Sequence, residues 1–235
     1  MNLSFVEMWA TMGLLARAVV VILAIMSLYS LYVTGDRLST YIRARSASLT
    51  FVEGLARALG KQDVKGALSL AAAQPQPPIA RVVHAGLREY VEGLEALRKV
   101  GPAEIGDFDV VDAVNRAVER VKEREVADLK RGLGGLATVA SAAPFVGLFG
   151  TTVGIISAFV SMAESGQGGL AAVSAGIAEA LVTTAFGILV AVPAVMLFNY
   201  FTGRVDDFVV DMNDVSSELV SFVLKEGRTS GGGRS

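Results

Sequence analysis

Three runs of apolar residues, each long enough to cross a lipid bilayer as a helix, constrain this sequence more than any other feature. The hydrocarbon layer is about 30 Å thick, and a helix needs about 20 residues to span it. The runs occupy residues 9–33, 132–162 and 171–203, and they contain only two charged residues, Arg17 and Glu179. With 52% hydrophobic residues in 235, the chain is predicted to be an all-α integral membrane protein with three transmembrane helices.

The first run is predicted to stay as a membrane helix rather than to be removed as a signal peptide. No Lys or Arg precedes it, and it is too long for the apolar core of a signal peptide. Arg17 lies close enough to its start for the side chain to reach the lipid headgroups. The second run would outlast the bilayer as a single helix, so the second and third helices are predicted to extend into a helical cytoplasmic region.

The distribution of basic residues predicts the orientation of the chain. Nearly all Lys and Arg lie between Arg37 and Arg131 or from Arg204 onward. Because cytoplasmic segments of membrane proteins carry the excess of basic residues, the N-terminus is expected outside and the C-terminus inside. The segments outside the membrane are then an extracytoplasmic N-terminus (1–8) and an extracytoplasmic loop (163–170). On the cytoplasmic side lie a helical region (34–131) and a tail with a flexible end (204–235).

The cytoplasmic region is predicted to consist of helices interrupted at "PQPP" and "GPAEIGDFD". Its last helix, "VVDAVNRAVERVKEREVADLKRGL", is expected to run straight into the second membrane span. No clustered nucleophile and base or nucleotide-binding loop is present, and the chain has no Cys and a single histidine, His84. We therefore predict no catalytic residues, no metal site and no cofactor, and neither an enzyme nor a nucleic-acid-binding protein.

Small residues recur every three or four positions in the second and third apolar runs. Membrane helices use such faces for close packing, because lipid supplies no hydrophobic drive for association. Each stripe also carries one threonine, Thr151 in the second helix and Thr184 in the third. Packing alone would explain the stripes, and threonines often bond only to their own helix backbone. The residues predicted to pack closely are Gly147, Gly154, Gly176, Ala180 and Gly187.

Glu179 favours a functional interpretation, because an ionisable residue inside a membrane span is costly and usually serves a function. At about 100° per residue, it lies about 140° around the helix from Thr184, so the two need not face one cavity. Whether Glu179 faces a pore or a subunit interface stays open, and Thr183 and Thr152 are further polar membrane residues considered for a role. A path lined by hydroxyls alone lacks a group that takes up and releases a proton, so a partner's membrane carboxylate would have to supply it.

The segments "APFVGLFGTTVGIISAF" and "GIAEALVTTAFGILVAVPAVMLFNY" resemble the MotA/TolQ/ExbB proton channel family, most closely its ExbB and TolQ branch. The resemblance implies a homopentameric collar around two copies of a single-span, ExbD- or TolR-like partner whose membrane aspartate carries the proton. By motif position it places the proton pathway at Thr151 and Thr184, and helix-bending prolines at Pro144 and Pro193. The chain departs from the usual "GTVWGI" with "GTTVGI", and Ala175 replaces a common proline.

The predicted function is a proton-conducting stator subunit in the bacterial inner membrane, which converts proton motive force into work on an envelope partner. Three outputs stay open, namely TonB-dependent uptake, Tol-Pal envelope maintenance and gliding motility of the AglR type, each with its own energy transducer of TonB, TolA or motility type. The ion is expected to be the proton, with sodium as the alternative. A passive helical scaffold is the alternative function. A self-sufficient transporter is disfavoured, because the sequence has neither its own mid-membrane titrating groups nor the inverted repeats of such proteins.

Overall fold

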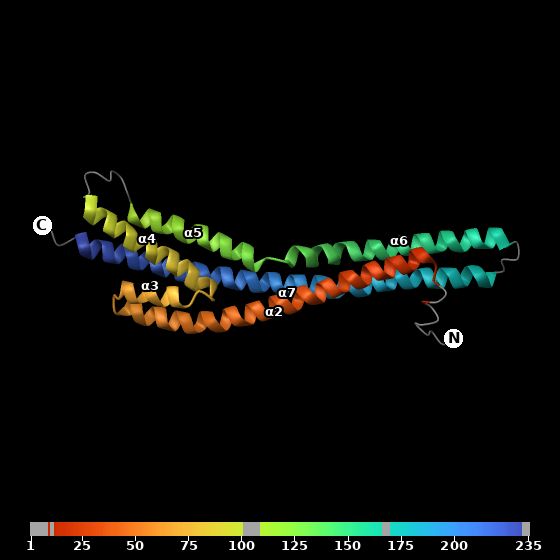
Figure 1. Cartoon of the computed structure of the whole chain (residues 1–235), viewed down its shortest axis with the longest axis horizontal. Helices are drawn as coiled ribbons and strands as arrows, with labels where there is room; N and C mark the ends of the chain where they lie inside the picture. Colours follow the sequence, from red (N-terminus) through yellow and green to blue (C-terminus); the bar gives the residue numbers. More distant parts are fainter. Residues whose placement is uncertain (1–8, 10–11, 101–108, 166–169, 232–235) are drawn as a thin grey trace. The chain divides into compact units, whose positions relative to one another are not determined.

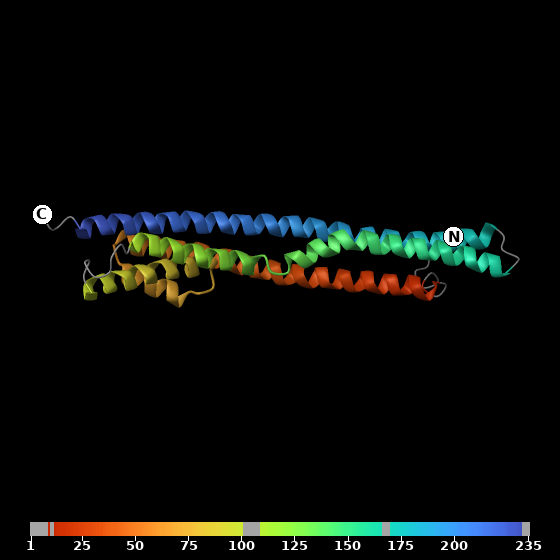
Figure 2. The same ribbon diagram turned by 90° about the horizontal axis from the view of Figure 1, so that it is seen from above.

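The chain is built from helices throughout the part that the structure describes. The computed structural model describes residues 9, 12–100, 109–165 and 170–231 (Figures 1 and 2). The helices in chain order are α2 (Leu14–Gly60), α3 (Val64–Ala73), α4 (Pro78–Val100), α5 (Val110–Leu129), α6 (Leu133–Ser165) and α7 (Leu170–Gly231). Helices α2 and α6 and the Gly176–Lys225 part of α7 are long and apolar enough to cross a membrane. The predicted fold class, all-α with three such helices, is confirmed.

The chain divides into two compact units, which we describe separately. Unit 1 comprises Met1–Arg37 and Gly132–Thr202, and unit 2 comprises Leu38–Arg131 and Gly203–Ser235. Unit 1 therefore contains the beginning of α2, all of α6 and the beginning of α7. Unit 2 contains the continuations of α2 and α7 together with α3, α4 and α5. The division falls within a few residues of the basic positions that the sequence places at the cytoplasmic side of the membrane.

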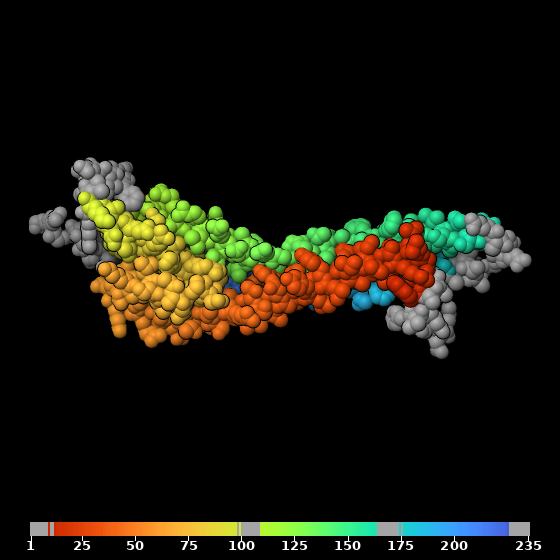
Figure 3. All heavy atoms as spheres, viewed as in Figure 1, coloured from red at the N-terminus to blue at the C-terminus, as the bar shows by residue number. Residues whose placement is uncertain are grey.

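Unit 1 is apolar on its outside as well as in its core. Its core is a cluster of small and medium side chains from all three helices: Val19, Leu23, Val139, Ala143, Ala191 and Ala194. Its surface carries many exposed large apolar side chains, among them Ile25, Leu28, Phe145, Phe149, Leu189 and Met196. Figure 3 shows α2 (red) lying beside α6 (green) on the face in view. An apolar exterior of this extent suits a bundle whose solvent is lipid.

Unit 2 has the core and the helix caps of a water-soluble helical bundle. Its largest fully buried side chains include Phe51, Leu87, Met212 and Leu219. Two of its helices begin at aspartates that cap them. The Asp63 carboxylate accepts a hydrogen bond from Gly66 N at the start of α3, and the Asp109 carboxylate accepts from Val111 N at the start of α5. The breaks predicted from "PQPP" and "GPAEIGDFD" fall between these helices, although residues 101–108 lie outside the described residues.

The prediction that the last cytoplasmic helix runs straight into the second membrane span is wrong. Helix α5 ends at Leu129, and α6 begins only at Leu133. Between them Gly132 has a φ of +84°, a left-handed conformation that glycine adopts without steric cost. The Tyr41 hydroxyl donates a hydrogen bond of 2.7 Å to the Leu129 carbonyl, which has no partner within its own helix. The glycine and this tyrosine together fix the break.

The predicted C-terminal tail, 204–235, is helical in its described part, and its flexible end stays a prediction. Helix α7 continues as far as Gly231. Residues 1–8 and half of the predicted extracytoplasmic loop, 166–169, lie outside the described residues, as do residues 232–235.

Replacing Tyr41 with Phe is expected to lower the free energy of unfolding by about 1–2 kcal/mol, because the buried Leu129 carbonyl loses its side-chain donor. The measurement is thermal or denaturant unfolding of the purified protein in detergent. The control is Tyr32→Phe, since Tyr32 is 73% exposed and its ring is retained. Equal unfolding midpoints for the two variants would contradict a capping role for Tyr41.

Candidate functional site

Helices α6 and α7 approach each other so closely in unit 1 that their backbones touch at two glycines. A Cβ atom added to Gly147 would lie 2.8 Å from the Thr183 carbonyl oxygen, and one added to Gly187 would lie 2.6 Å from the Ala143 carbonyl oxygen. Both distances are shorter than any non-bonded contact that a Cβ atom tolerates, and the obstacle in each case is backbone. Only glycine therefore fits at these two positions.

The same contact continues along both helices on other small residues. A Cβ on Gly154 would lie 2.8 Å from the Cβ of Ala180, and one on Gly176 would lie 2.5 Å from the Cβ of Ala158. The five residues that the sequence assigns to close packing thus all lie at the α6–α7 contact. Sequence reasoning missed Gly150, where an added Cβ would meet the side chains of Thr183 and Val19.

Three threonine hydroxyls gather where the helices are closest. The Thr151 and Thr184 hydroxyls are in direct hydrogen-bond contact across the interface. Each of them also lies 3.2 Å from the Gly147 carbonyl oxygen, and Thr183 Oγ1 lies 3.1 Å from that same oxygen. The Ala180 carbonyl oxygen is a second shared acceptor, at 3.2 Å from Thr151 Oγ1 and 2.7 Å from Thr183 Oγ1.

This network contains more hydrogen-bond acceptors than hydroxyl protons to donate. Each hydroxyl has a single proton to donate, and Thr151 alone has three acceptors in reach: the carbonyls of Gly147 and Ala180 and the oxygen of Thr184. Several arrangements of hydrogen bonds are therefore close in energy, and a hydroxyl can switch between them by rotating. Thr183 is completely buried, whereas Thr151 and Thr184 are only partly buried. The partly buried pair is the part of the network that another molecule can reach.

Thr152 does not join this network. Its side chain is exposed, and its hydroxyl donates to the Leu148 carbonyl of its own helix at 3.0 Å. Pro144 and Pro193 lie inside α6 and α7, respectively. Because proline has no N–H, each leaves the carbonyl four residues earlier without its helical donor, and the helix bending that the family resemblance implies for them stays a prediction.

Glu179 points away from the threonines, toward the start of α2. Its Oε1 atom accepts a hydrogen bond of 3.0 Å from the backbone N–H of Gly13. It also lines a cleft of about 710 Å³ within unit 1, to which α2, α6 and α7 all contribute, including Ser157 and Ser161 of α6. The sequence predicts that Glu179 and Thr184 lie on different sides of α7, and in the structure the two side chains contact different helices. The contact with Gly13 has no signal in the sequence.

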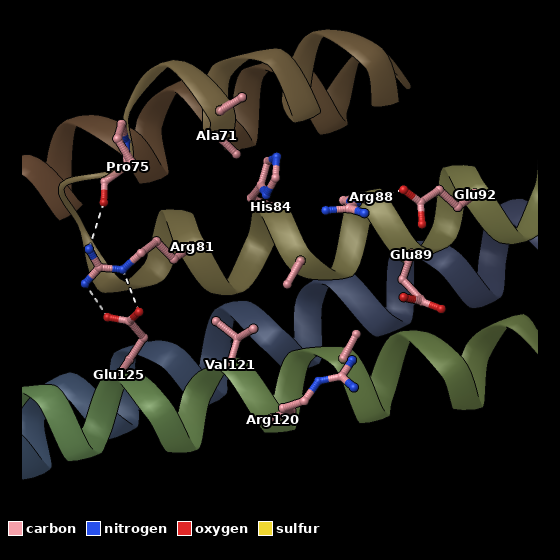
Figure 4. A pocket seen from close by; sticks show the side chains of 13 residues that line it. Ala71, Pro75, Arg81, His84, Arg88, Glu89, Glu92, Arg120, Val121 and Glu125 are labelled. Carbon is pink, nitrogen blue, oxygen red and sulfur yellow. Dashed lines mark hydrogen bonds and ion pairs between the residues drawn. The ribbon is translucent and has the colours of Figure 1, made fainter.

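Unit 2 contains a second cleft, of about 560 Å³, which α3, α4 and α5 line, and its charged side chains come from α4 and α5 (Figure 4). Arg81 is held on one side of it: its Nε donates to Glu125 Oε1 at 2.6 Å, and its Nη1 donates to the Pro75 carbonyl at 3.0 Å. Glu125 is buried, so this ion pair compensates a charge inside the unit. His84 lines the same cleft, as an ordinary side chain of intermediate burial.

A second ion pair in this cleft is exposed. A hydrogen bond from Arg88 Nε to Glu92 Oε1, 2.7 Å long, raises the pKa of Arg88 further above its ordinary value. Both ion pairs of this cleft therefore join side chains of unit 2 to one another.

The Gly187→Ala variant is expected to be destabilised by about 2 kcal/mol or more, because the new methyl group meets backbone atoms that cannot rotate away. Gly203→Ala on the same helix is the control, since an added Cβ there has no neighbour within 4 Å. That control should be neutral or more stable by up to about 1 kcal/mol, as alanine is the better helix former. Thermal unfolding in detergent measures both variants, and an unaffected Gly187→Ala protein would mean that the helices do not touch here.

The three apolar helices, the apolar exterior of unit 1 and the hydroxyl network at the α6–α7 contact define a multi-span membrane protein with a polar cluster between two of its helices. The model of the MotA/TolQ/ExbB proton channel family matches residues 74–214, more than half of the chain, and includes all three threonines. The chain belongs to this family.

Individual relatives come from both the ExbB and the TolQ proteins. The chain is 38% identical over 127 residues to the biopolymer transport protein ExbB of Pseudomonas putida, covering 49% of this chain and 39% of that protein. It is 35% identical over 156 residues to the Tol-Pal system protein TolQ of Pseudomonas aeruginosa, covering 66% and 65%. For TolQ of Haemophilus influenzae the identity is 37% over 117 residues, covering 50% and 51%. The matched part thus spans less than two thirds of each relative's length.

Proposed function

We propose that this protein is the proton-conducting stator subunit of an inner-membrane motor of the ExbB–ExbD or TolQ–TolR type. The observation that carries the proposal is the pair of partly buried hydroxyls, Thr151 and Thr184, in contact within a largely apolar unit. In lipid, such a pair is a polar point on an apolar surface, which a partner's polar side chain or water can approach.

The hydroxyl pair can assist a proton but cannot hold one. A threonine hydroxyl both donates and accepts, so it can pass a hydrogen bond along while its own charge stays zero. The titrating group must therefore come from elsewhere, and we assign it to a membrane aspartate of a single-span partner that faces the pair. Desolvation in the membrane favours the protonated form of such a carboxyl, which couples its protonation to movement. The driving force is about 2.3 kcal/mol per proton per 100 mV.

The assembly and its placement follow from the same proposal. Five copies of the chain would form a collar around two copies of the partner, with the N-terminus outside and the C-terminus in the cytoplasm. The names of the relatives support two outputs, biopolymer transport and the Tol-Pal system. Gliding motility is a third output. The partner's extracytoplasmic part and its transducer, of TonB, TolA or motility type, would determine which one operates.

Proton flux into proteoliposomes tests the proposal, with the chain co-reconstituted with the single-span protein encoded beside it. Thr151→Val and Thr184→Val keep the side-chain volume and remove the hydroxyl, so each is expected to reduce the flux at least tenfold, a change of about 1.4 kcal/mol in the barrier. Thr152→Val is the matched control, because its hydroxyl bonds only its own helix. It should conduct like the wild type.

The passive scaffold is the competing function, and the same experiment separates it. A scaffold would use the glycine contact and the threonines for packing alone. It would give no flux above empty liposomes with any partner. If there is flux but Thr151→Val and Thr184→Val conduct normally, the hydroxyl pair is not on the proton pathway, and the proposed mechanism is wrong.

A further inference from the structure

Glu179 is the only charged residue in the third apolar run, and its observed partner is a backbone N–H rather than another ionisable group. We propose that Glu179 is a positioning residue that fastens the amino-terminal end of α2 to α7, and that it does not carry the proton. The proton pathway at Thr184 and the hydrogen bond at Glu179 then have separate roles, although both residues lie on α7.

The geometry at the start of α2 is that of a helix N-cap. The Arg17 N–H donates to the Gly13 carbonyl at 3.0 Å, which makes Gly13 the residue that opens the helix. In a capping box, a glutamate three residues further along the same helix turns back and accepts a hydrogen bond from the N–H of the cap residue. Here residue 16 is an alanine, and Glu179 supplies the carboxylate from α7. Because Ala16 has no acceptor in its side chain, this contact is provided by another helix.

A carboxylate suits this place for two physical reasons. The N-terminal end of a helix carries a partial positive charge from its aligned peptide dipoles, which favours a negative group beside it. A backbone N–H at a helix end near lipid is also costly if it stays without a partner. Glu179 satisfies the N–H and complements the dipole. An acidic residue in an apolar run is thus explained without any proton transfer.

The surrounding contacts show how Glu179 is aimed at α2. Its neighbour Ala180 packs against Gly154, and Gly176, one turn earlier, packs against Ala158, so the α6-facing side of α7 is filled on both sides of Glu179. Glu179 projects instead into the cleft that the first residues of α2 line, from Gly13 to Ala16. Loss of the hydrogen bond would free this end of α2 and widen the cleft.

The test uses the absence of cysteine from the chain, which makes an engineered pair specific. Leu15→Cys and Ser157→Cys place thiols on α2 and α6 across the cleft, and a short bis-maleimide reports how often the two helices are close. Glu179→Gln retains an oxygen acceptor of the same reach and loses only the charge, so cross-linking should stay within about twofold of the parent. Glu179→Asp is too short to reach Gly13, and Glu179→Ala has no acceptor. For both we expect the cross-linked fraction to fall by about fivefold, the effect of one lost hydrogen bond.

Proton flux of the same variants, without the cysteines, supplies the readout that a purely local packing change would not give. The inference predicts that Glu179→Gln keeps both the flux and its pH profile, whereas Glu179→Asp, which retains the carboxyl, loses flux. A proton carrier would behave in the opposite way, with Asp active and Gln inactive, and this result would overturn the inference. Because Gln and Asp decide the outcome, it does not depend on the folding of the Ala variant.

The inference rests on the proposed function only for its flux readout. Absence of flux in the wild-type complex would refute the proposed function, while the cross-linking series would still decide whether Glu179 fastens α2. Thr184→Val is the control in the other direction, since it should lose flux and keep the parent's cross-linking. Unchanged cross-linking in both Glu179→Asp and Glu179→Ala would refute the fastening even if flux were normal.

Discussion

The structure of unit 1 depends on the close approach of α6 and α7 at Gly147 and Gly187. In lipid, two helices gain nothing from hiding apolar surface, so their association comes from close packing and hydrogen bonding. At this contact the backbones come near enough for threonines of α7 to reach a carbonyl of α6. A larger residue at either glycine would separate the helices, and the hydroxyls would then lose one another. The hydrogen bonds between the threonines therefore depend on the close packing at these two glycines.

The polar groups of unit 1 are divided between two tasks. Thr151, Thr183 and Thr184 all lie within hydrogen-bond distance of the Gly147 carbonyl, and the partly buried pair, Thr151 and Thr184, is the one that the proposed partner would face. Glu179 lies on another side of α7 and satisfies the backbone of α2. This division accounts for a membrane helix that contains both a carboxylate and adjacent hydroxyls without placing them in a single site. The apolar exterior is left to lipid.

Much of this arrangement could be predicted from the sequence, because the relevant signals are local or periodic. The apolar runs gave the long helices, and the spacing of small residues gave the face on which Gly147 and Gly187 meet. The break at Gly132 was missed, since the helical propensity on both sides is high and the last carbonyl of α5, at Leu129, bonds a tyrosine 88 positions earlier in the chain. The burial of Thr183 was missed for a related reason. Periodicity gives angles on one helix, but not which neighbours occupy each side.

The bond between Glu179 and Gly13 lay outside any sequence pattern, because it joins residues 166 positions apart through a backbone atom. Every residue except proline has a backbone N–H, so the residue type does not indicate which N–H donates to a long-range partner. Glycine at the start of a helix is compatible with many kinds of cap. The hydrogen bond that underlies the proposed capping role of Glu179 is therefore visible only in the three-dimensional structure.

The most direct test of the central claim is disulfide formation in the otherwise cysteine-free Thr151→Cys/Thr184→Cys variant, followed by non-reducing electrophoresis. Since the two hydroxyls touch within one chain, mild oxidation should form the disulfide quickly, and the protein should still migrate as a monomer. Thr152→Cys/Thr184→Cys should not oxidise within the chain, because Thr152 faces away from the contact. Disulfide-linked dimers, or two thiols that stay reduced, would contradict the α6–α7 contact on which this account depends.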